Sequence, residues 1–208
     1  TPVTGGNVSF YNESPRGAID PTPVIGMIGV IEGEGSVTAS FKDEGDAIML
    51  FGETREELGG SEYLAAIHHR KAGKPPRVDL KAERALQQLM VEAASRGLLK
   101  SAHDCSDGGL AVAIAESCIM DEHHLTGATI QLLSHRAIER LRADALLFGE
   151  SAGRIVISCA RHHLELVEHL ARRHSVPAAI IGKVGGARLT ITPWIEESVD
   201  VLSGAWRS

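Results

Sequence analysis

Aromatic residues are scarce in this chain of 208 residues, because tryptophan, tyrosine and phenylalanine together make up only 4% of it. So few aromatic side chains argue against the stacking platform that single-stranded nucleic acids need. Basic residues are not in excess either, since 21 Lys and Arg against 27 Asp and Glu give a formal net charge of −6. This charge argues against a footprint on a phosphate backbone, while local binding of a nucleotide with a metal ion stays possible. Nucleic acid is therefore not an expected partner.

Cysteines and long apolar runs are also few. The three cysteines, Cys105, Cys118 and Cys159, are too few and odd in number for a disulfide framework, so a reducing, cytoplasmic setting fits best. No apolar run approaches the roughly 20 residues that are needed to cross a bilayer, so we expect no membrane as a partner.

The remaining composition is that of an ordinary globular protein, with 43% hydrophobic and 23% charged residues. The length suffices for one good core, or for one full domain that carries the remnant of another. Strand-like and helix-like patterns alternate along the chain, with hairpin patterns at both ends. This order predicts a mixed α/β or α+β domain in which helices cover a sheet.

Hydrophobic periodicity places the predicted elements. Residues 24–31 are apolar on both faces, which predicts a buried strand, and the glycine-containing break at 33–35 predicts a boundary between domains 1–33 and 34–208. Asp79 is the expected N-cap of a helix that ends at Gly97. Further strands are predicted at 36–41, 47–51, 128–133, 154–159, 178–184 and 188–192, and further helices at about 63–67, 110–120, 134–142 and 161–174.

The first candidate site is the polar, glycine-containing stretch at residues 4–13. Gly5 and Gly6 can take positive φ and let a phosphate approach the backbone, while the oxygens of Asn7 and Glu13 suit a hard cation such as Mg²⁺. The alternative is an ordinary Gly-Gly-Asn turn between two strands. Because this stretch stands at the start of the chain, we expect the chain to be the C-terminal piece of a longer protein.

The second candidate site is the polar loop at residues 101–109, which leads into a predicted helix. Helix N-termini attract anions, and the glycines at 108 and 109 would let one come close. In the alternative interpretation, Ser106 or Asp107 caps the helix and Asp104 ties the loop down. A nucleophilic pair of Cys105 and His103 is not favoured, because residues two apart in a loop seldom have the necessary geometry.

Two other patterns give weaker evidence for a catalytic or metal-binding site. The sequence Gly-Glu-Ser-Ala-Gly at 149–153 superficially matches the Gly-x-Ser-x-Gly elbow of hydrolases, but it leads into a predicted strand, whereas an elbow leads into a helix. His162, Glu165 and His169 could share one helical face, but their spacing is not that of a known metal site, so solvated surface histidines are the better interpretation.

Five motifs in order resemble the phosphoribosylformylglycinamidine synthase family, in particular its synthetase subunit. The motifs lie at residues 4–13, 21–29, 58–63, 101–113 and 149–154, so the resemblance covers essentially the whole chain. It implies an ATP-dependent enzyme of purine biosynthesis that activates the formamide oxygen of formylglycinamide ribonucleotide by phosphoryl transfer and replaces it with ammonia. The ammonia would come from a separate glutaminase subunit, and a small third subunit would bridge the two.

The resemblance also implies a domain plan and site residues. The family contains two tandem copies of an A domain and a B domain, so residues 1–33 are similar to the last strands of the second A domain. Residues 34–208 resemble the second B domain, and hence the C-terminal domain of aminoimidazole ribonucleotide synthetase. By position, Gly6 matches the ATP-contacting glycine, Asn7 the Mg²⁺ ligand and Ser9 the substrate-contacting serine. The missing N-terminal portion of the same polypeptide would be a partner.

The family's catalytic histidine and most of its metal-binding acids belong to the first A domain, so the resemblance assigns no catalytic residue here. We therefore expect the isolated chain to be inactive and to bind Mg-ATP weakly at best. Other interpretations are a relative such as aminoimidazole ribonucleotide synthetase or selenophosphate synthetase, and a non-catalytic nucleotide-binding or interdomain structural module.

Overall fold

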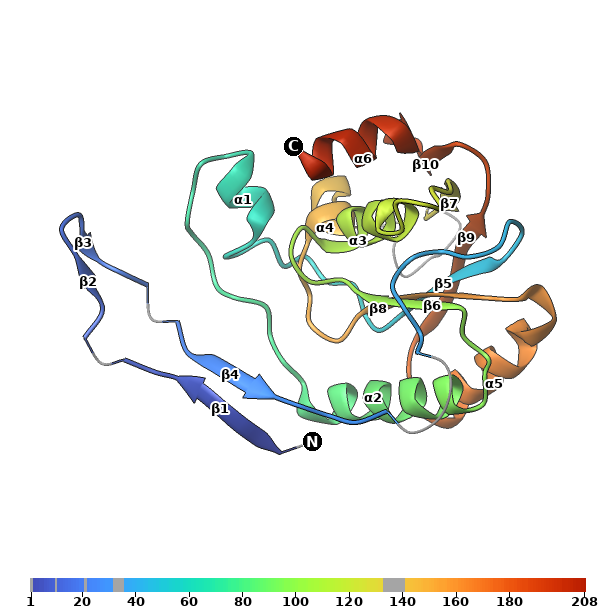
Figure 1. The fold of residues 1–208 in the computed structure, drawn as a ribbon, viewed down its shortest axis with the longest axis horizontal. Helices are drawn as coiled ribbons and strands as arrows, with labels where there is room; N and C mark the ends of the chain where they lie inside the picture. The colour runs from blue at the N-terminus through green and yellow to red at the C-terminus, as the bar shows by residue number, and fades with distance from the viewer. Residues whose placement is uncertain (1, 10, 21, 32–35, 133–140) are drawn as a thin grey trace. The chain divides into compact units, whose positions relative to one another are not determined.

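A computed structural model of the chain describes all residues except 1, 10, 21, 32–35 and 133–140. The chain divides into two compact units, Thr1–Ser36 and Val37–Ser208, which are described separately (Figure 1).

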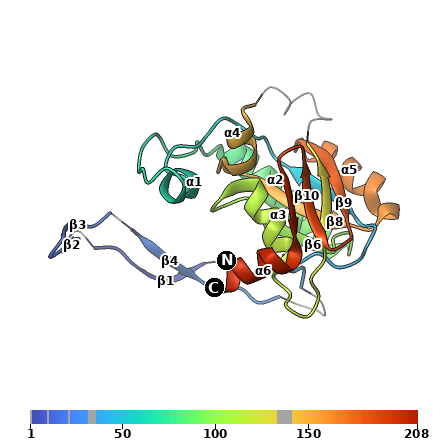
Figure 2. The ribbon, with the colours of Figure 1, turned by 90° about the horizontal axis from the view of Figure 1, so that it is seen from above.

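The larger unit is built around a sheet that has seven strands within the described residues, in the order β11-β10-β7-β9-β5-β8-β6. Neighbouring strands are antiparallel except β7 and β10, which are parallel. Figure 2 views this sheet from above. The strands are β5 (Ala47–Phe51), β6 (Ser101–Asp104), β7 (Ala128–Gln131), β8 (Ile155–Cys159), β9 (Ala178–Val184), β10 (Arg188–Thr192) and β11 (Ile195–Ser198).

Helices cover both faces of the sheet (Figure 1). Helix α3 packs with α4 and α6, and helix α2 packs with α5. Strand β5 shows the two faces directly, because Ile48 and Leu50 belong to the core under α3, while Met49 and Phe51 belong to the core under α2. The helices are α1 (Glu62–Ala66), α2 (Leu80–Ser95), α3 (Gly109–Ile119), α4 (Ala143–Phe148), α5 (Leu164–Arg173) and α6 (Val199–Arg207), with a 3₁₀ turn at Arg161–His163.

Helix α2 follows its local sequence signals. The Asp79 carboxylate accepts hydrogen bonds from the backbone N–H groups of Lys81 and Ala82, as expected of an N-cap. These bonds hold the pKa of Asp79 below its usual value. Gly97 follows the helix with φ +64°, a conformation that suits glycine.

The smaller unit consists of two antiparallel strand pairs, β1 (Val3–Asn7) with β4 (Val24–Met27) and β2 (Glu13–Ser14) with β3 (Gly17–Ala18). The prediction of a buried strand at 24–31 was therefore wrong in extent and in burial. Ile25 is 65% exposed and Val30 is 90% exposed. A two-stranded pair has no layer of its own that could cover these side chains.

Two further predictions need correction. Residues 36–41 form no strand, only a bridge between Thr38 and Ser101, because the chain bends after Thr38 and the Phe41 N–H donates to the Ser117 carbonyl in α3 at 2.8 Å. Residues 101–104, predicted as loop, form edge strand β6 against β8. Most of the helix predicted at 134–142 falls outside the described residues, and the helix found nearby is α4. Within the described parts of the chain, no helix is long and apolar enough to cross a membrane.

Candidate functional site

The glycines of the first candidate site lie in strand β1. Gly5 pairs with Gly26 and Gly6 pairs with Ile25, and neither Gly5 nor Gly6 has a positive φ, so that part of the prediction was wrong. Gly6 is required for another reason. A Cβ atom at this position would lie 2.2 Å from the carbonyl oxygen of Val24, so only glycine lets the two backbones come this close.

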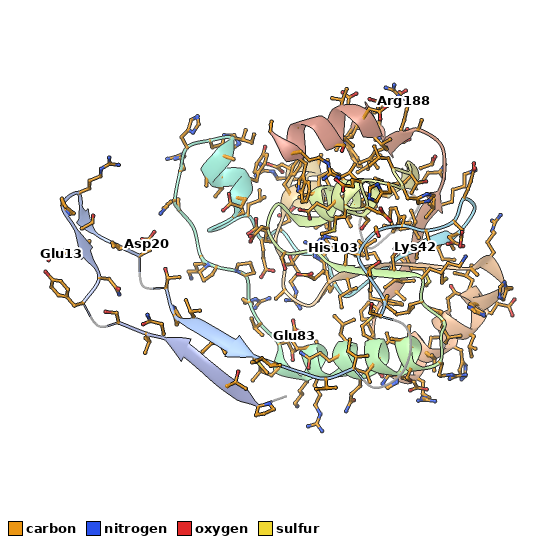
Figure 3. All side chains as sticks on the ribbon, viewed as in Figure 1. Glu13, Asp20, Lys42, Glu83, His103 and Arg188 are labelled. Atoms are coloured by element: carbon orange, nitrogen blue, oxygen red, sulfur yellow. The ribbon has the colours of Figure 1, made fainter. Side chains whose placement is uncertain are left out.

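The polar side chains follow directly after this strand pair. Asn7 is exposed at the end of β1, opposite Val24. Two residues on, the Ser9 hydroxyl donates a hydrogen bond to the Tyr11 carbonyl at 2.8 Å and accepts one from the Tyr11 N–H at 3.2 Å. The Tyr11 hydroxyl in turn donates to Glu13 on β2 at 2.6 Å, and this bond raises the pKa of Tyr11 (Figure 3). These hydrogen bonds link Ser9, Tyr11 and Glu13, and Asn7 lies two residues before Ser9.

Asn7 fits a role as one ligand of a hard cation, since the residue is exposed and its amide oxygen is the kind of ligand that Mg²⁺ prefers. It cannot hold the ion alone. Among the residues that the structure describes, no group of three or more His, Cys, Asp or Glu side chains could bind a metal. The remaining ligands of a magnesium ion here would have to be phosphate, water or groups outside these residues.

In the larger unit, three of the glycine-containing motifs come together at Glu150. One carboxylate oxygen of Glu150 accepts hydrogen bonds from the backbone N–H of Gly108 and from that of Glu62, both at 2.8 Å. Gly108 precedes α3 and Glu62 begins α1. The motifs at 58–63, 101–113 and 149–154 are therefore joined by one side chain, a juxtaposition that the sequence did not predict.

Close backbone approaches hold the same loops. A Cβ atom on Gly109 would lie 2.5 Å from the Gly149 carbonyl oxygen, and one on Gly52 would lie 1.9 Å from that of Gly153. Both Gly52 and Gly109 have positive φ. The glycines in these motifs thus serve the packing of one loop on another.

Arg154 braces the loop at 149–154 from inside. Its guanidinium group donates to the carbonyls of Ser151 and Gly149 and, at 3.3 Å, to the Thr54 hydroxyl. The side chain is almost fully buried, and this burial lowers the pKa of Arg154. Buried Ser151 exchanges hydrogen bonds with the Arg55 backbone, so its hydroxyl is structural, and β8 follows the loop as the sequence predicted.

A cleft of about 580 Å³ lies beside these loops. Its lining includes the apolar side chains of Val78, Leu86 and Ile155. The polar lining comes from residues 104–107 and 150–154 and from α2, where Glu83 is labelled in Figure 3. At its rim the Ser106 hydroxyl donates to Asp104 and holds the pKa of that carboxyl below its usual value. Neither Ser106 nor Asp107 caps α3, whose N-cap is Gly108 with no side-chain bond.

Cys105 and His103 do not form a nucleophilic pair. Burial raises the pKa of Cys105 to about 11, so the thiolate is scarce at neutral pH. The His103 ring instead lies beside α3, with Nε2 3.1 Å from a Glu116 carboxylate oxygen, though neither ring nitrogen makes an aligned hydrogen bond (Figure 3).

All three cysteines should resist labelling in the native chain. They are buried free thiols, and burial also raises the pKa of Cys118 to about 12 and that of Cys159 to about 11. At pH 8 we expect a disulfide reagent to modify them at least about a hundredfold more slowly than in the unfolded chain, because less than about 1% of each thiol is ionised. Modification of any one thiol at the unfolded rate would contradict this prediction.

Comparison with known proteins places the fold. A family model described as "AIR synthase related protein, C-terminal domain" matches residues 43–192, which is well over half of the chain. The chain belongs to this family.

The curated relatives that the chain resembles are longer than this chain. The phosphoribosylformylglycinamidine synthase subunit PurL of Anaeromyxobacter sp. (strain K) is 44% identical over 210 residues, which covers 100% of this chain and 28% of that protein. The subunit PurL of Moorella thermoacetica is 48% identical over 192 residues, covering 92% of this chain and 25% of that protein. The chain thus spans about a quarter of the length of these relatives.

Solved structures agree on the fold of this C-terminal domain family. The structure described as Thermotoga maritima PurL complexed with FGAR has a TM-score of 0.68 at 22% identity, with 80% of this chain and 29% of that chain covered. The structure of PurLQS from the same organism has a TM-score of 0.59 at 21% identity, with 80% and 27% covered. The predicted fold, a helix-covered sheet like the C-terminal domain of aminoimidazole ribonucleotide synthetase, is confirmed.

Proposed function

We propose that this chain is the C-terminal part of an ATP-dependent carbon–nitrogen ligase of purine biosynthesis. The whole enzyme would convert formylglycinamide ribonucleotide, ATP and glutamine-derived ammonia to formylglycinamidine ribonucleotide, ADP and phosphate. The observation that carries the proposal is the identity of 44% and 48% with two PurL subunits over 100% and 92% of this chain. Solved structures with 20% identity, described as T. maritima PurL complexed with ATP and with ADP, agree with ATP as the nucleotide.

The proposal includes a division of labour within the chain. Residues 1–33 would be the end of a second A domain and residues 34–208 a second B domain. In the first part, the Gly6 backbone would contact ATP, Asn7 would ligate Mg²⁺ and Ser9 would contact the ribonucleotide. The exposed position of Asn7 at the end of β1, two residues before Ser9, supports this assignment.

The residues of this chain would bind and orient the nucleotide and the substrate, and none of them would act as the general acid or base. Magnesium would neutralise the phosphate charge that develops during phosphoryl transfer, and Asn7 would supply one neutral oxygen to it. Partners of the chain would be the N-terminal portion of the polypeptide, a glutaminase subunit and a small bridging subunit. A cytoplasmic setting fits the three free, buried thiols.

Reconstitution tests the proposal. The chain is mixed with the N-terminal portion and the glutaminase partners, and ATP-dependent conversion of formylglycinamide ribonucleotide is measured. We expect activity only in the mixture, and a loss of at least about a hundredfold for Asn7→Ala, because a metal ligand matters at least as much as the groups that orient one.

Two variants serve as controls for the reconstitution. Asn7→Asp keeps an oxygen ligand and should retain more activity than Asn7→Ala, while Arg16→Ala, between β2 and β3, should be unaffected. An inactive mixture in which the parts nevertheless associate would overturn the ligase proposal. It would favour a structural or nucleotide-binding module instead.

A further inference from the structure

A side-chain carboxylate of the chain itself lies at the N-terminus of α3. Helix α3 spans 11 residues, and its N-cap, Gly108, has φ +77° and no side chain to offer the unpaired N–H groups of the first turn. These groups and the helix dipole attract negative charge. In this chain the charge comes from Glu150, which lies 42 residues further along and accepts the Gly108 N–H at 2.8 Å.

The backbone brings Glu150 to this place. The strand-to-helix turn at Gly109 touches the backbone of residues 148–149 so closely that a Cβ atom would collide with it. The N–H of Glu150 itself donates to the Glu57 carbonyl at 3.2 Å, which fixes the start of its side chain. The same carboxylate oxygen that reaches Gly108 also accepts the N–H of Glu62 at 2.8 Å.

We propose that Glu150 is a built-in anion that fills the position where a bound phosphate or carboxylate would otherwise sit. It acts as a positioning residue, because one oxygen fixes the first turns of both α1 and α3 and thereby the edge of the neighbouring cleft. The Gly108-Gly109 turn is consequently closed to external anions as long as Glu150 is present. Removing its side chain opens a site for a small carboxylate or for inorganic phosphate.

Chemical rescue tests this proposal without any enzymatic assay, so its outcome is independent of the ligase proposal. Hydrogen exchange of the Gly108 and Glu62 amides is followed by NMR in the 208-residue chain and in Glu150→Ala. In the variant we expect both amides to lose protection by about tenfold or more, the usual effect of losing a hydrogen bond to a charged group. Sodium acetate should restore protection saturably, and sodium chloride at the same ionic strength should not.

A control variant removes an exposed glutamate elsewhere in the chain. Glu165 lies in the first turn of α5 and is exposed, so Glu165→Ala should neither change the protection of the two amides nor create a response to acetate. Unchanged protection in Glu150→Ala would overturn the proposal. An equal effect of acetate and chloride would do the same.

Glu150→Gln covers the case in which Glu150→Ala does not fold. The amide oxygen of glutamine can accept the same two N–H bonds and leaves no space for an added anion. We expect both amides to stay protected to within about a few fold, since a neutral acceptor keeps most of the bond, and acetate to have no effect. Binding of acetate by folded Glu150→Gln would count against the proposal, because the glutamine side chain fills the same position.

Discussion

Gly52→Ala is expected to lower the free energy of unfolding by about 3 kcal/mol or more, because a strained backbone and a steric collision add. Gly52 follows β5 with φ +91°, and a Cβ atom there would lie 1.9 Å from the carbonyl oxygen of Gly153 and 3.1 Å from the Cα atom of Arg154. The backbone cannot easily move away. The Gly52 N–H donates to the Pro177 carbonyl at 2.9 Å, and Arg154 is buried.

Two other glycines separate the two contributions. Gly97 has φ +64° but open space around its Cα, so Gly97→Ala should cost only the strain of about 1 to 2 kcal/mol. Gly204 lies in α6 with no atom near a would-be Cβ, so Gly204→Ala should stabilise the chain by up to about 1 kcal/mol. Urea denaturation followed by circular dichroism measures all three. If Gly52→Ala lowered the free energy of unfolding no more than Gly97→Ala does, this result would contradict the close approach of the backbones at Gly52 and Gly153.

Sequence patterns were sufficient wherever the signal is local. The bounds of β9 and β10 agree with the predicted strands at 178–184 and 188–192. Helix α2 begins after its predicted cap, Asp79, because a capping carboxylate acts within one turn of the chain. These elements combine a clear hydrophobic period with end signals of their own.

Elements with weaker local signals were missed. Strand β6 contains His103 and Asp104 and looks like a loop, but it forms because β8 offers it an edge far away in the sequence. Helix α6 was not predicted, although Ser198 caps it and accepts the N–H of Val201. A capping serine three residues before that amide was therefore the signal that could have found it.

For the candidate sites, the sequence identified the segments but not their arrangement. The glycine motifs around Gly60, Gly108 and Gly149 could be found one at a time. Their common partner, Glu150, could not, because the bonds span up to 88 residues. The assignments of Gly6, Asn7 and Ser9 depend on a ligand and on a longer chain, so they stay predictions.

The second large effect concerns Arg154. Replacing it with methionine should lower the free energy of unfolding by about 3 to 5 kcal/mol, because three acceptors lose their charged donor and each buried polar group left unsatisfied costs about 1 to 3 kcal/mol. This loss of stability arises at the groups that accept hydrogen bonds from Arg154. The carbonyls of Gly149 and Ser151 and the Thr54 hydroxyl would lose their donors. A whole buried ion pair can sometimes be replaced by apolar side chains without loss of stability. That is impossible here, because the two backbone carbonyls remain polar in every variant.

Two further variants identify the origin of the effect. Arg154→Lys keeps the charge, but one ammonium group cannot reach three acceptors in the fork geometry of a guanidinium, so at least about half of the loss should remain. Arg84→Met, on the exposed side of α2, should change stability by no more than about 0.5 kcal/mol. The measurement is again urea denaturation. Full stability of Arg154→Lys would mean that charge alone is needed, because lysine keeps the positive charge that arginine carries. A loss shared by methionine and lysine would instead show that the three fixed hydrogen bonds hold the loop, and with it the carboxylate of Glu150, in place.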